Sequence, residues 1–340
     1  MSEENVYKNS KGELKIKKFD SSKDKLISFI LKCDINELAT LNIFDEVLLK
    51  ENLSKSKEKL NSLIESDKLS FYYLEKNEEI IGLYCLSSLK ETNSISFIIS
   101  KDERNKGYGK TGLFLLLKEL STSQQNIDEY FFTVKKDNIY ASLIVYGNNA
   151  SLVKETENDY ILKIEKNNNV WFHKVKNDDL PKVMKITKSA KELLKQNGSL
   201  QWQTGYPNEE TFTNDIKKGD LYGLFEGDEL MGYGAYIYGK DPNYVNIDGK
   251  WDIPANDRDM AIHRVAVDEN CHGKKYGRKI LEYGIKYAKK LGCVTVKVDT
   301  HKKNIPMQKT IEKSGFIYKG VVVILTEKLD NLRLAYEIVL

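Results

Sequence analysis

One pattern occurs twice in the 340-residue chain and constrains its fold more than any other feature. In residues 261–278, AIHRVAVDENCHGKKYGR, a strand-like apolar run precedes a glycine-containing loop and a segment with helical spacing of its apolar residues. Residues 96–110, SFIISKDERNKGYGK, have the same order. Gly109 and Gly277 lie 277 − 109 = 168 residues apart, and Asn138 and Asn304 lie 304 − 138 = 166 residues apart. Two landmarks at nearly one offset, close to half of the chain, predict an internal duplication.

The second copy of this pattern predicts a binding site for an anion. The first N–H groups of a helix have no partner within the helix, and the helix dipole favours negative charge at that end. Lys274, Lys275 and Arg278 add positive charge beside the loop. We therefore expect a phosphate or pyrophosphate group at the start of this helix.

Length and composition predict two domains of an ordinary soluble protein. A chain of 340 residues with 41% hydrophobic and 30% charged residues is long enough for two cores. The net charge of +3 is too small to indicate a nucleic-acid partner. The four cysteines form no C-x-x-C pair, and no signal peptide or long apolar run is present. We therefore expect free cysteines, a cytoplasmic location, no membrane partner and no metal site.

The predicted elements follow a mixed α and β order in both halves. The first half predicts strands at 13–19, 71–74, 80–86, 95–99, 130–134 and 160–164, and helices at 23–49, 53–64, after Gly109 and at 139–146. The second half predicts strands at 171–175, 222–225, 232–238, 262–267, 294–298, 317–325 and 332–339, and helices at 180–196, 209–217, 278–291 and after Asn304. The polar run 167–169 is the best linker. We therefore expect domains at 1–168 and 169–340.

The long segment 241–259 is polar and carries aromatic residues, which is typical of a functional loop. Trp202, Tyr206 and Trp251 could line a pocket for a second substrate. Packing in the core is the alternative for each of them, because aromatic side chains dominate protein cores.

The two loops resemble the signature [QR]-x-x-G-x-[GA] of the GNAT superfamily of acyl-CoA-dependent N-acyltransferases. Residues 104–109, RNKGYG, match it fully, whereas residues 272–277, HGKKYG, have His272 in place of Gln or Arg and Lys275 in place of the first glycine. The second half also contains Asn304 and the run EKSGF at 312–316, which are similar to a later family segment. A nucleotide-binding P-loop is excluded by Arg104, and neither loop supplies a dinucleotide-binding G-x-G-x-x-G.

The resemblance implies an α+β fold of two tandem GNAT-like domains, each with a mixed, mostly antiparallel sheet flanked by helices. It implies acetyl-CoA as the cofactor and a small-molecule or peptide amine as the acceptor. The implied cofactor-binding residues are Val265, Ala266, Val267, His272, Gly273, Lys274, Lys275, Tyr276, Gly277, Arg278 and Asn304 in the second copy, and Arg104, Lys106, Gly107, Tyr108, Gly109 and Lys110 in the first. Lys275 at a glycine position of the signature is tolerable if its backbone avoids a positive φ, because only glycine adopts one without cost.

His263 is the candidate catalytic base, because histidine titrates near neutral pH and this residue precedes the second loop. Strand alternation predicts that it shares a face with Val265 and Val267. A histidine with a purely structural role is an equal alternative. The tyrosine that the family uses as a general acid is absent, since the corresponding positions hold Val145 and Ile311.

We expect the second domain to catalyse N-acetyl transfer and the first to be a degenerate copy. Two alternatives stay open. The first domain could be the catalytic one, since its loop fits the signature better, or the chain could be a non-catalytic acyl-CoA binder or sensor.

Overall fold

The computed structural model describes residues 6–9, 12–19, 29, 69–88, 92–122, 127–271, 273–325 and 330–340. The chain divides into two compact units, Met1–Asn169 and Val170–Leu340. The predicted helices at 23–49 and 53–64 lie outside the described residues, apart from residue 29, and so does His272.

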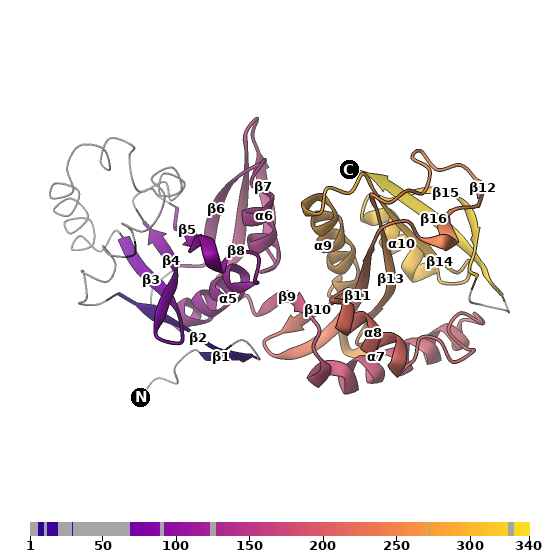
Figure 1. The fold of residues 1–340 in the computed structure, drawn as a ribbon, viewed down its shortest axis with the longest axis horizontal. Coiled ribbons are helices and arrows are strands. Elements are labelled where there is room, and N and C mark those ends of the chain that lie inside the picture. The colour runs from indigo at the N-terminus through magenta and orange to yellow at the C-terminus, as the bar shows by residue number, and fades with distance from the viewer. Residues whose placement is uncertain are drawn as a thin grey trace. The chain divides into compact units, whose positions relative to one another are not determined.

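The N-terminal unit contains an eight-stranded sheet in the order β1-β2-β3-β4-β5-β6-β8-β7 (Figure 1). All neighbouring strands are antiparallel except β5 and β6, which are parallel. The strands are β1 (Val6–Asn9), β2 (Gly12–Lys18), β3 (Leu69–Lys76), β4 (Glu79–Ser87), β5 (Ser94–Ile99), β6 (Glu129–Lys135), β7 (Ser151–Glu155) and β8 (Asp159–Glu165).

A short 3-10 turn, η1 (Lys101–Glu103), follows β5 and precedes helix α5 (Tyr108–Ser121). Helix α6 (Ile139–Tyr146) follows β6 and is capped by Asn138, whose side chain accepts a hydrogen bond from the N–H of Ala141. The leucines of α5 pack with Leu74 and Tyr84 in the core of this unit. Strand β7 was not predicted, because all five of its residues are exposed and no buried alternation marks it.

The C-terminal unit contains a second eight-stranded sheet in the order β9-β10-β11-β13-β14-β16-β15-β12 (Figure 1). Its strands are β9 (Val170–Lys174), β10 (Leu221–Glu226), β11 (Glu229–Tyr238), β12 (Ile247–Gly249), β13 (Asp259–Val267), β14 (Thr295–Thr300), β15 (Ile317–Val323) and β16 (Leu332–Val339). Here too only one neighbouring pair, β13 and β14, is parallel. Without the edge strands β1 and β12, the two sheets have the same strand order.

Helices cover both faces of the second sheet. The helices are α7 (Leu180–Gln196), α8 (Glu209–Lys218), α9 (Tyr276–Lys290) and α10 (Ile305–Lys313), and the short turns are η2 (Asn177–Asp179), η3 (Pro242–Tyr244) and η4 (Glu269–Cys271). Tyr233 of β11 contacts Thr187 of α7 and Phe212 of α8, whereas Tyr236 donates a hydrogen bond to the carbonyl of Ile280 in α9. Since Tyr233 and Tyr236 point to opposite faces of β11, α7 and α8 lie on one face and α9 on the other.

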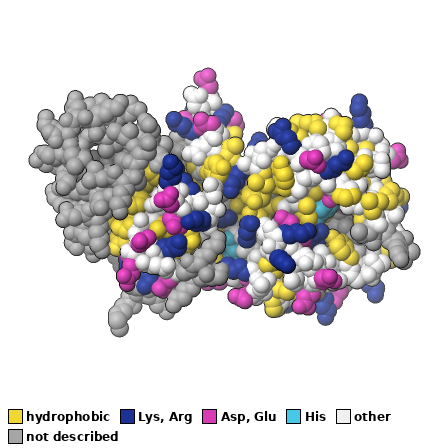
Figure 2. Space-filling view, viewed as in Figure 1, with side chains coloured by type: hydrophobic (Ala, Val, Ile, Leu, Met, Phe, Trp, Pro, Cys, Tyr) yellow, Lys and Arg dark blue, Asp and Glu magenta, His cyan; other side chains and the backbone are white. Residues whose placement is uncertain are grey.

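The α+β fold with two mixed, mostly antiparallel sheets confirms the predicted fold class. On the face drawn in Figure 2, Lys and Arg side chains are interspersed with Asp and Glu and with hydrophobic side chains over the described surface. No helix among the described residues has the length and apolar character needed to cross a bilayer.

Candidate active site

The parallel strands β13 and β14 are paired over only part of their length. Their register extends from Asp259 opposite Thr295 to Ile262 opposite Val298 and stops there. Strand β13 continues to Val267 along β11, and β14 continues to Thr300 along β16. Beyond Ile262 the edge of β13 that faces β14 therefore has no strand partner among the described residues, and its backbone groups could bind a ligand.

A bulge interrupts β13 at the same place. Ala235 of β11 pairs with His263, whereas Tyr233 pairs with Ala266, so β13 has one extra residue in this interval. Arg264 within the bulge has a positive φ of 52°. A bulge reverses the alternation of side chains that follow it.

The predicted shared face of His263, Val265 and Val267 is therefore wrong. A Cβ on Gly234 would lie 2.8 Å from Ile280 and 3.6 Å from Val265, which places Val265 on the α9 side of the sheet. Val267 likewise lies near Gly277 of α9. His263 points to the opposite face, because the extra residue in the bulge shifts the alternation by one.

His263 lies between two carboxylates on that face. Its Nε2 is 2.7 Å from Oδ2 of Asp241, and its Nδ1 is 3.8 Å from Oδ1 of Asp299. Tyr244 donates a 2.7 Å hydrogen bond to Asp299, and its ring stacks on the imidazole at 5.7 Å. The side chains of His263, Asp241 and Asp299 are 15%, 10% and 8% exposed.

Burial opposes the ionisation of Asp241, but the hydrogen bonds from His263 and Asn243 and the histidine charge hold the pKa of this carboxyl below its ordinary value. A carboxylate that accepts a ring N–H fixes the tautomer and the orientation of the imidazole. Asp241 can therefore hold the proton on Nε2 and leave Nδ1 as the proton-accepting nitrogen.

Arg264 forms a second polar group beside His263. Its guanidinium donates to both oxygens of Asp215 at 2.8 and 3.0 Å and to the hydroxyl of Tyr206 at 2.7 Å. The bidentate pair is mostly buried, with 8% and 9% exposure for the two side chains. Such a pair holds the strained bulge residue in place, since a positive φ costs about 1–3 kcal/mol in a non-glycine residue.

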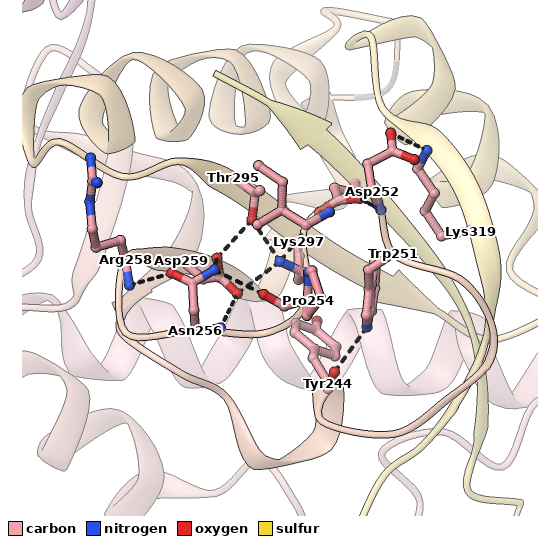
Figure 3. A network of polar contacts seen from close by, with 12 residues as sticks. Tyr244, Trp251, Asp252, Pro254, Asn256, Arg258, Asp259, Thr295, Lys297 and Lys319 are labelled. Atoms are coloured by element: carbon pink, nitrogen blue, oxygen red, sulfur yellow. Dashed lines mark hydrogen bonds and ion pairs between the residues drawn. The ribbon is translucent and has the colours of Figure 1, made fainter.

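The segment 241–259 is fixed onto the sheet by a buried network (Figure 3). Lys297 is fully buried, lies 2.8 Å from Asp259 and 3.4 Å from Glu337, and lies over the ring of Trp251. Glu337 accepts a 2.8 Å hydrogen bond from the N–H of Asp252. Because a buried charge is costly unless it is paired, this network holds the segment that carries Asp241.

The predicted pocket aromatics have mainly structural contacts. Trp251 is 5% exposed and donates to the carbonyl of Tyr244, and Trp202 is 8% exposed. The hydroxyl of Tyr206 accepts a hydrogen bond from Arg264, the residue that follows His263. The segment 241–259 itself contains η3 and β12, so it is more ordered than a loop of that length predicts.

The start of α9 lies beyond the bulge and η4. No described side chain caps helix α9, and its first internal hydrogen bond joins the N–H of Lys279 to the carbonyl of Lys275. The N–H groups of Tyr276, Gly277 and Arg278 precede that bond and are the donors that an anion needs. The N–H of Lys274 is already used by the carbonyl of Cys271.

Lys275 does not meet the condition set for it. It has a φ of 61° and is the N-cap of α9, in the left-handed region that favours glycine. At the equivalent position Gly107 has a φ of 90° and is the N-cap of α5. The preceding left-handed positions are Asn105 in the first copy and Gly273 in the second. Both loops thus have left-handed backbone at the same two positions. Glycine occupies the later position in the first loop and the earlier position in the second loop.

Two of the three charged side chains at the second loop form ion pairs with nearby glutamates. Lys274 lies 2.6 Å from Glu226, whose carboxylate also accepts the hydroxyl of Tyr276, and Arg278 lies 2.7 Å from Glu282. Lys275 forms no ion pair with any described residue. Asn304 accepts a hydrogen bond from the N–H of Met307 and caps α10.

The same elements in the N-terminal unit are more closed. A Cβ on Gly109 would lie 2.7 Å from Ile144 and 3.3 Å from Ile99, whereas one on Gly277 would lie 3.5 Å from Thr310 and 3.9 Å from Val267. Arg104 donates to the carbonyl of Ile99 at 2.9 Å, at the end of β5. Ile144 therefore fills the space that Thr310 leaves open in the second copy.

The other first-copy residues support their own unit. Lys106 lies 3.3 Å from Glu103, and the ring of Tyr108 lies under Lys76. The carbonyl of Lys110 accepts a hydrogen bond from Asn148. No group of His, Cys, Asp and Glu side chains that could hold a metal ion occurs among the described parts of either unit.

The sequence did not reveal Asp241, Asp299 or Asp215 as neighbours of His263. Their separation in the chain reaches 299 − 215 = 84 residues, and no motif links them. The only local signal was the polar and aromatic character of segment 241–259.

Comparison with known proteins gives a family for this site. Residues 187–316 match the model of the Acetyltransferase (GNAT) family, a range that includes β13, the second loop and Asn304. No curated protein matches the chain.

Several solved structures are similar to half of the chain. A GNAT-family acetyltransferase from Streptococcus agalactiae 2603 is 28% identical over 50% of this chain and 95% of its own, with a TM-score of 0.45. A putative acetyltransferase from Staphylococcus aureus MU50 is 26% identical over 49% of this chain and 97% of its own, with a TM-score of 0.38. Spermidine N-acetyltransferase from Vibrio cholerae, solved with CoA and spermine, is 16% identical over 47% and 98%, with a TM-score of 0.38.

The matched range includes the end of the β13–β14 pairing, the bulge in β13 and the start of α9, all within the C-terminal unit. The C-terminal unit of this chain belongs to the GNAT family of acetyltransferases.

Proposed function

We propose that the C-terminal unit transfers an acetyl group from acetyl-CoA to a primary amine, and that the N-terminal unit is a non-catalytic copy. The observation that carries this proposal is that the β13–β14 pairing ends at Ile262, directly before His263, on the strand that leads to the start of α9, which no described side chain caps. An acyl donor and an amine can meet there from opposite faces of the parted sheet.

The residues of this unit fit a CoA thioester. The N–H groups of Tyr276, Gly277 and Arg278 would bind the pyrophosphate, with Gly273 and Lys275 shaping the loop. The backbone of Val265, Ala266 and Val267 would bind the pantetheine arm along the unpaired edge of β13. The ion pair between Lys274 and Glu226 would support the loop, and Asn304 would hold the neighbouring helix start.

Acetyl-CoA supplies an activated acetyl group, and the chain must supply a neutral amine. An alkyl amine has a pKa of about 10.4 in water, so a base has to remove a proton near neutral pH. His263 is the proposed base, oriented by Asp241. An ammonium ion loses two protons on becoming an amide: one passes through His263 to solvent, and the other ends on the CoA thiol.

The N-terminal unit lacks two parts of this arrangement. Its strand β5 has no histidine, and Ile144 occupies the space beside Gly109. We therefore assign the loop from Arg104 to Lys110 a structural role and assign the cofactor to the second loop. The described cysteines Cys85, Cys271 and Cys293 are free thiols, which supports the cytoplasmic location expected from the sequence.

Calorimetric titration of CoA into the full chain tests the cofactor assignment. Gly277→Val should weaken CoA binding at least about tenfold, because a branched side chain would cover the first-turn N–H groups. Gly109→Val, its matched control, should leave CoA affinity unchanged. Equal affinity in both variants and the parent chain would refute the assignment, and loss only in Gly109→Val would move the cofactor to the N-terminal unit.

Turnover of acetyl-CoA with a panel of amines tests the activity itself. Release of the CoA thiol should depend on the amine and yield the N-acetyl product by mass spectrometry. Tight CoA binding without turnover across polyamines, amino acids, aminoglycosides and peptides would instead support a non-catalytic binder.

A further inference from the structure

We infer that Asp299 is the acceptor-binding residue, which holds an alkyl amine as its ammonium ion beside His263. This inference rests on the proposed function and specifies the form in which the acceptor binds. It predicts a preference for basic alkyl amines over weakly basic amines that are neutral in water.

The side chains around His263 carry more negative than positive charge. Asp215 forms a bidentate pair with Arg264, so these two charges offset each other. Asp241 and Asp299 then remain, and one imidazole can offset at most one of them. Since a mostly buried carboxylate is costly without a positive partner, the site is complementary to an added cation.

One carboxylate oxygen of Asp299 has no described hydrogen-bond donor. Its side chain is 8% exposed, and the contacts it makes with the described side chains, from Tyr244 and His263, go to Oδ1. Oδ2 accepts no hydrogen bond from any described residue. An alkylammonium ion has three N–H donors and would give this oxygen a charge-assisted hydrogen bond.

The same nitrogen of the acceptor can reach His263. Nε2 is held by Asp241, and Nδ1 faces Asp299 at 3.8 Å, so a group bound at Asp299 lies next to the free ring nitrogen. A proton that leaves the ammonium ion passes to Nδ1, which gives a neutral amine and an imidazolium ion stabilised by Asp241. Asp299 binds the acceptor before this transfer, and His263 accepts the proton.

Nuclear magnetic resonance of the full chain with ¹⁵N-labelled histidine tests the binding step without any acyl donor. The chain has four histidines, and His263→Gln identifies the signals of His263 by their loss. Titration with n-butylammonium chloride should shift these signals saturably, whereas aniline, which is neutral at pH 7.5, should shift them little.

Asp299→Asn keeps the shape and an oxygen for the hydroxyl of Tyr244 but removes the charge. It should weaken the n-butylammonium response about tenfold or more, the usual scale for loss of a charge-assisted hydrogen bond. Asp248→Asn changes an exposed carboxylate on β12 and should respond like the parent chain. Unchanged CoA affinity would verify that Asp299→Asn is folded.

An equal response in Asp299→Asn and the parent chain, or no response of His263 to n-butylammonium, would overturn the inference. These outcomes are distinct from failure of the proposed function, which would appear as absent CoA binding or absent turnover. A selective ammonium response in a chain without transferase activity would retain the site and reject the reaction.

Discussion

Strand β5 of the N-terminal unit and strand β13 of the C-terminal unit occupy the same place in two sheets of the same order, but only β13 is bulged. The register of β4 with β5 is unbroken from Gly82 opposite Ile99 to Ser87 opposite Ser94. The register of β11 with β13 shifts near Arg264. One extra residue directs His263 to the acidic cluster and keeps Val265 against α9.

The loops that follow these two strands also differ, but here it is the first copy that matches the family signature better. The first loop has glycine at the N-cap position and fits the family signature fully, whereas the second has Lys275 there with a positive φ. Yet in the first copy Ile144 packs close to Gly109. Under the proposed function, a full match to the loop signature does not by itself identify the cofactor-binding copy, because packing beside the loop also depends on a side chain from another helix.

The largest expected effect is on catalysis. His263→Ala should lower kcat by roughly 10²–10⁴, the scale for loss of a positioned general base, while CoA affinity changes little. Ser96→Ala, in β5 of the other unit, should leave kcat unchanged. The measurement is the pH–rate profile of both variants with an accepted amine. An unaltered profile for His263→Ala would remove this residue from the mechanism, and loss of activity in Ser96→Ala would reverse the roles of the two units.

The next effect is on the local stability of the two helix starts. Gly277→Ala meets only ordinary contacts and should stabilise α9 slightly, whereas Gly109→Ala places a methyl group against Ile144. The two changes in free energy of unfolding should differ by about 1–3 kcal/mol. Hydrogen exchange of peptides from α5 and α9 measures each helix in the full chain. Equal changes in both helices would show that Ile144 does not fill the first site.

A smaller effect is expected at the N-cap positions. Lys275→Gly should stabilise α9 by about 1 kcal/mol, because glycine adopts a positive φ without the steric cost of a side chain. Gly107→Ala should destabilise α5 by a similar amount. Thermal denaturation together with hydrogen exchange tests this pair. A destabilised Lys275→Gly variant would mean that the lysine side chain supports the loop more than its backbone strains it.

The smallest effect is a dependence of stability on acid pH. The pKa of Asp241 is lowered in the folded unit, so its contribution is complete above the ordinary aspartate pKa of about 3.9 and is lost as pH falls through the lower folded value. Asp241→Asn should therefore reduce stability at pH 6 more than at pH 3, by urea denaturation. The exposed Asp248→Asn should show no such difference, and a pH-independent loss in Asp241→Asn would place its role in packing alone.

The sequence alone determined the duplicated order of elements, the mixed fold and the two glycine loops. These features follow from local periodicity, caps and turns, which neighbouring residues decide, and helix α7 was predicted with its observed bounds. Strand β7 was missed because its exposed residues carry no such periodicity.

Only the tertiary structure decided which side of the sheet His263 faces and which residues surround it. The face depends on a bulge whose register is set by pairing with β11, and a one-residue shift moves every following side chain to the other face. The closure of the first loop depends on Ile144 from a separate helix. Asp241, Asp299 and Arg264 come from a loop and two strands, and they meet because β13 and β14 pair in parallel, with the intervening residues of the chain crossing over the sheet.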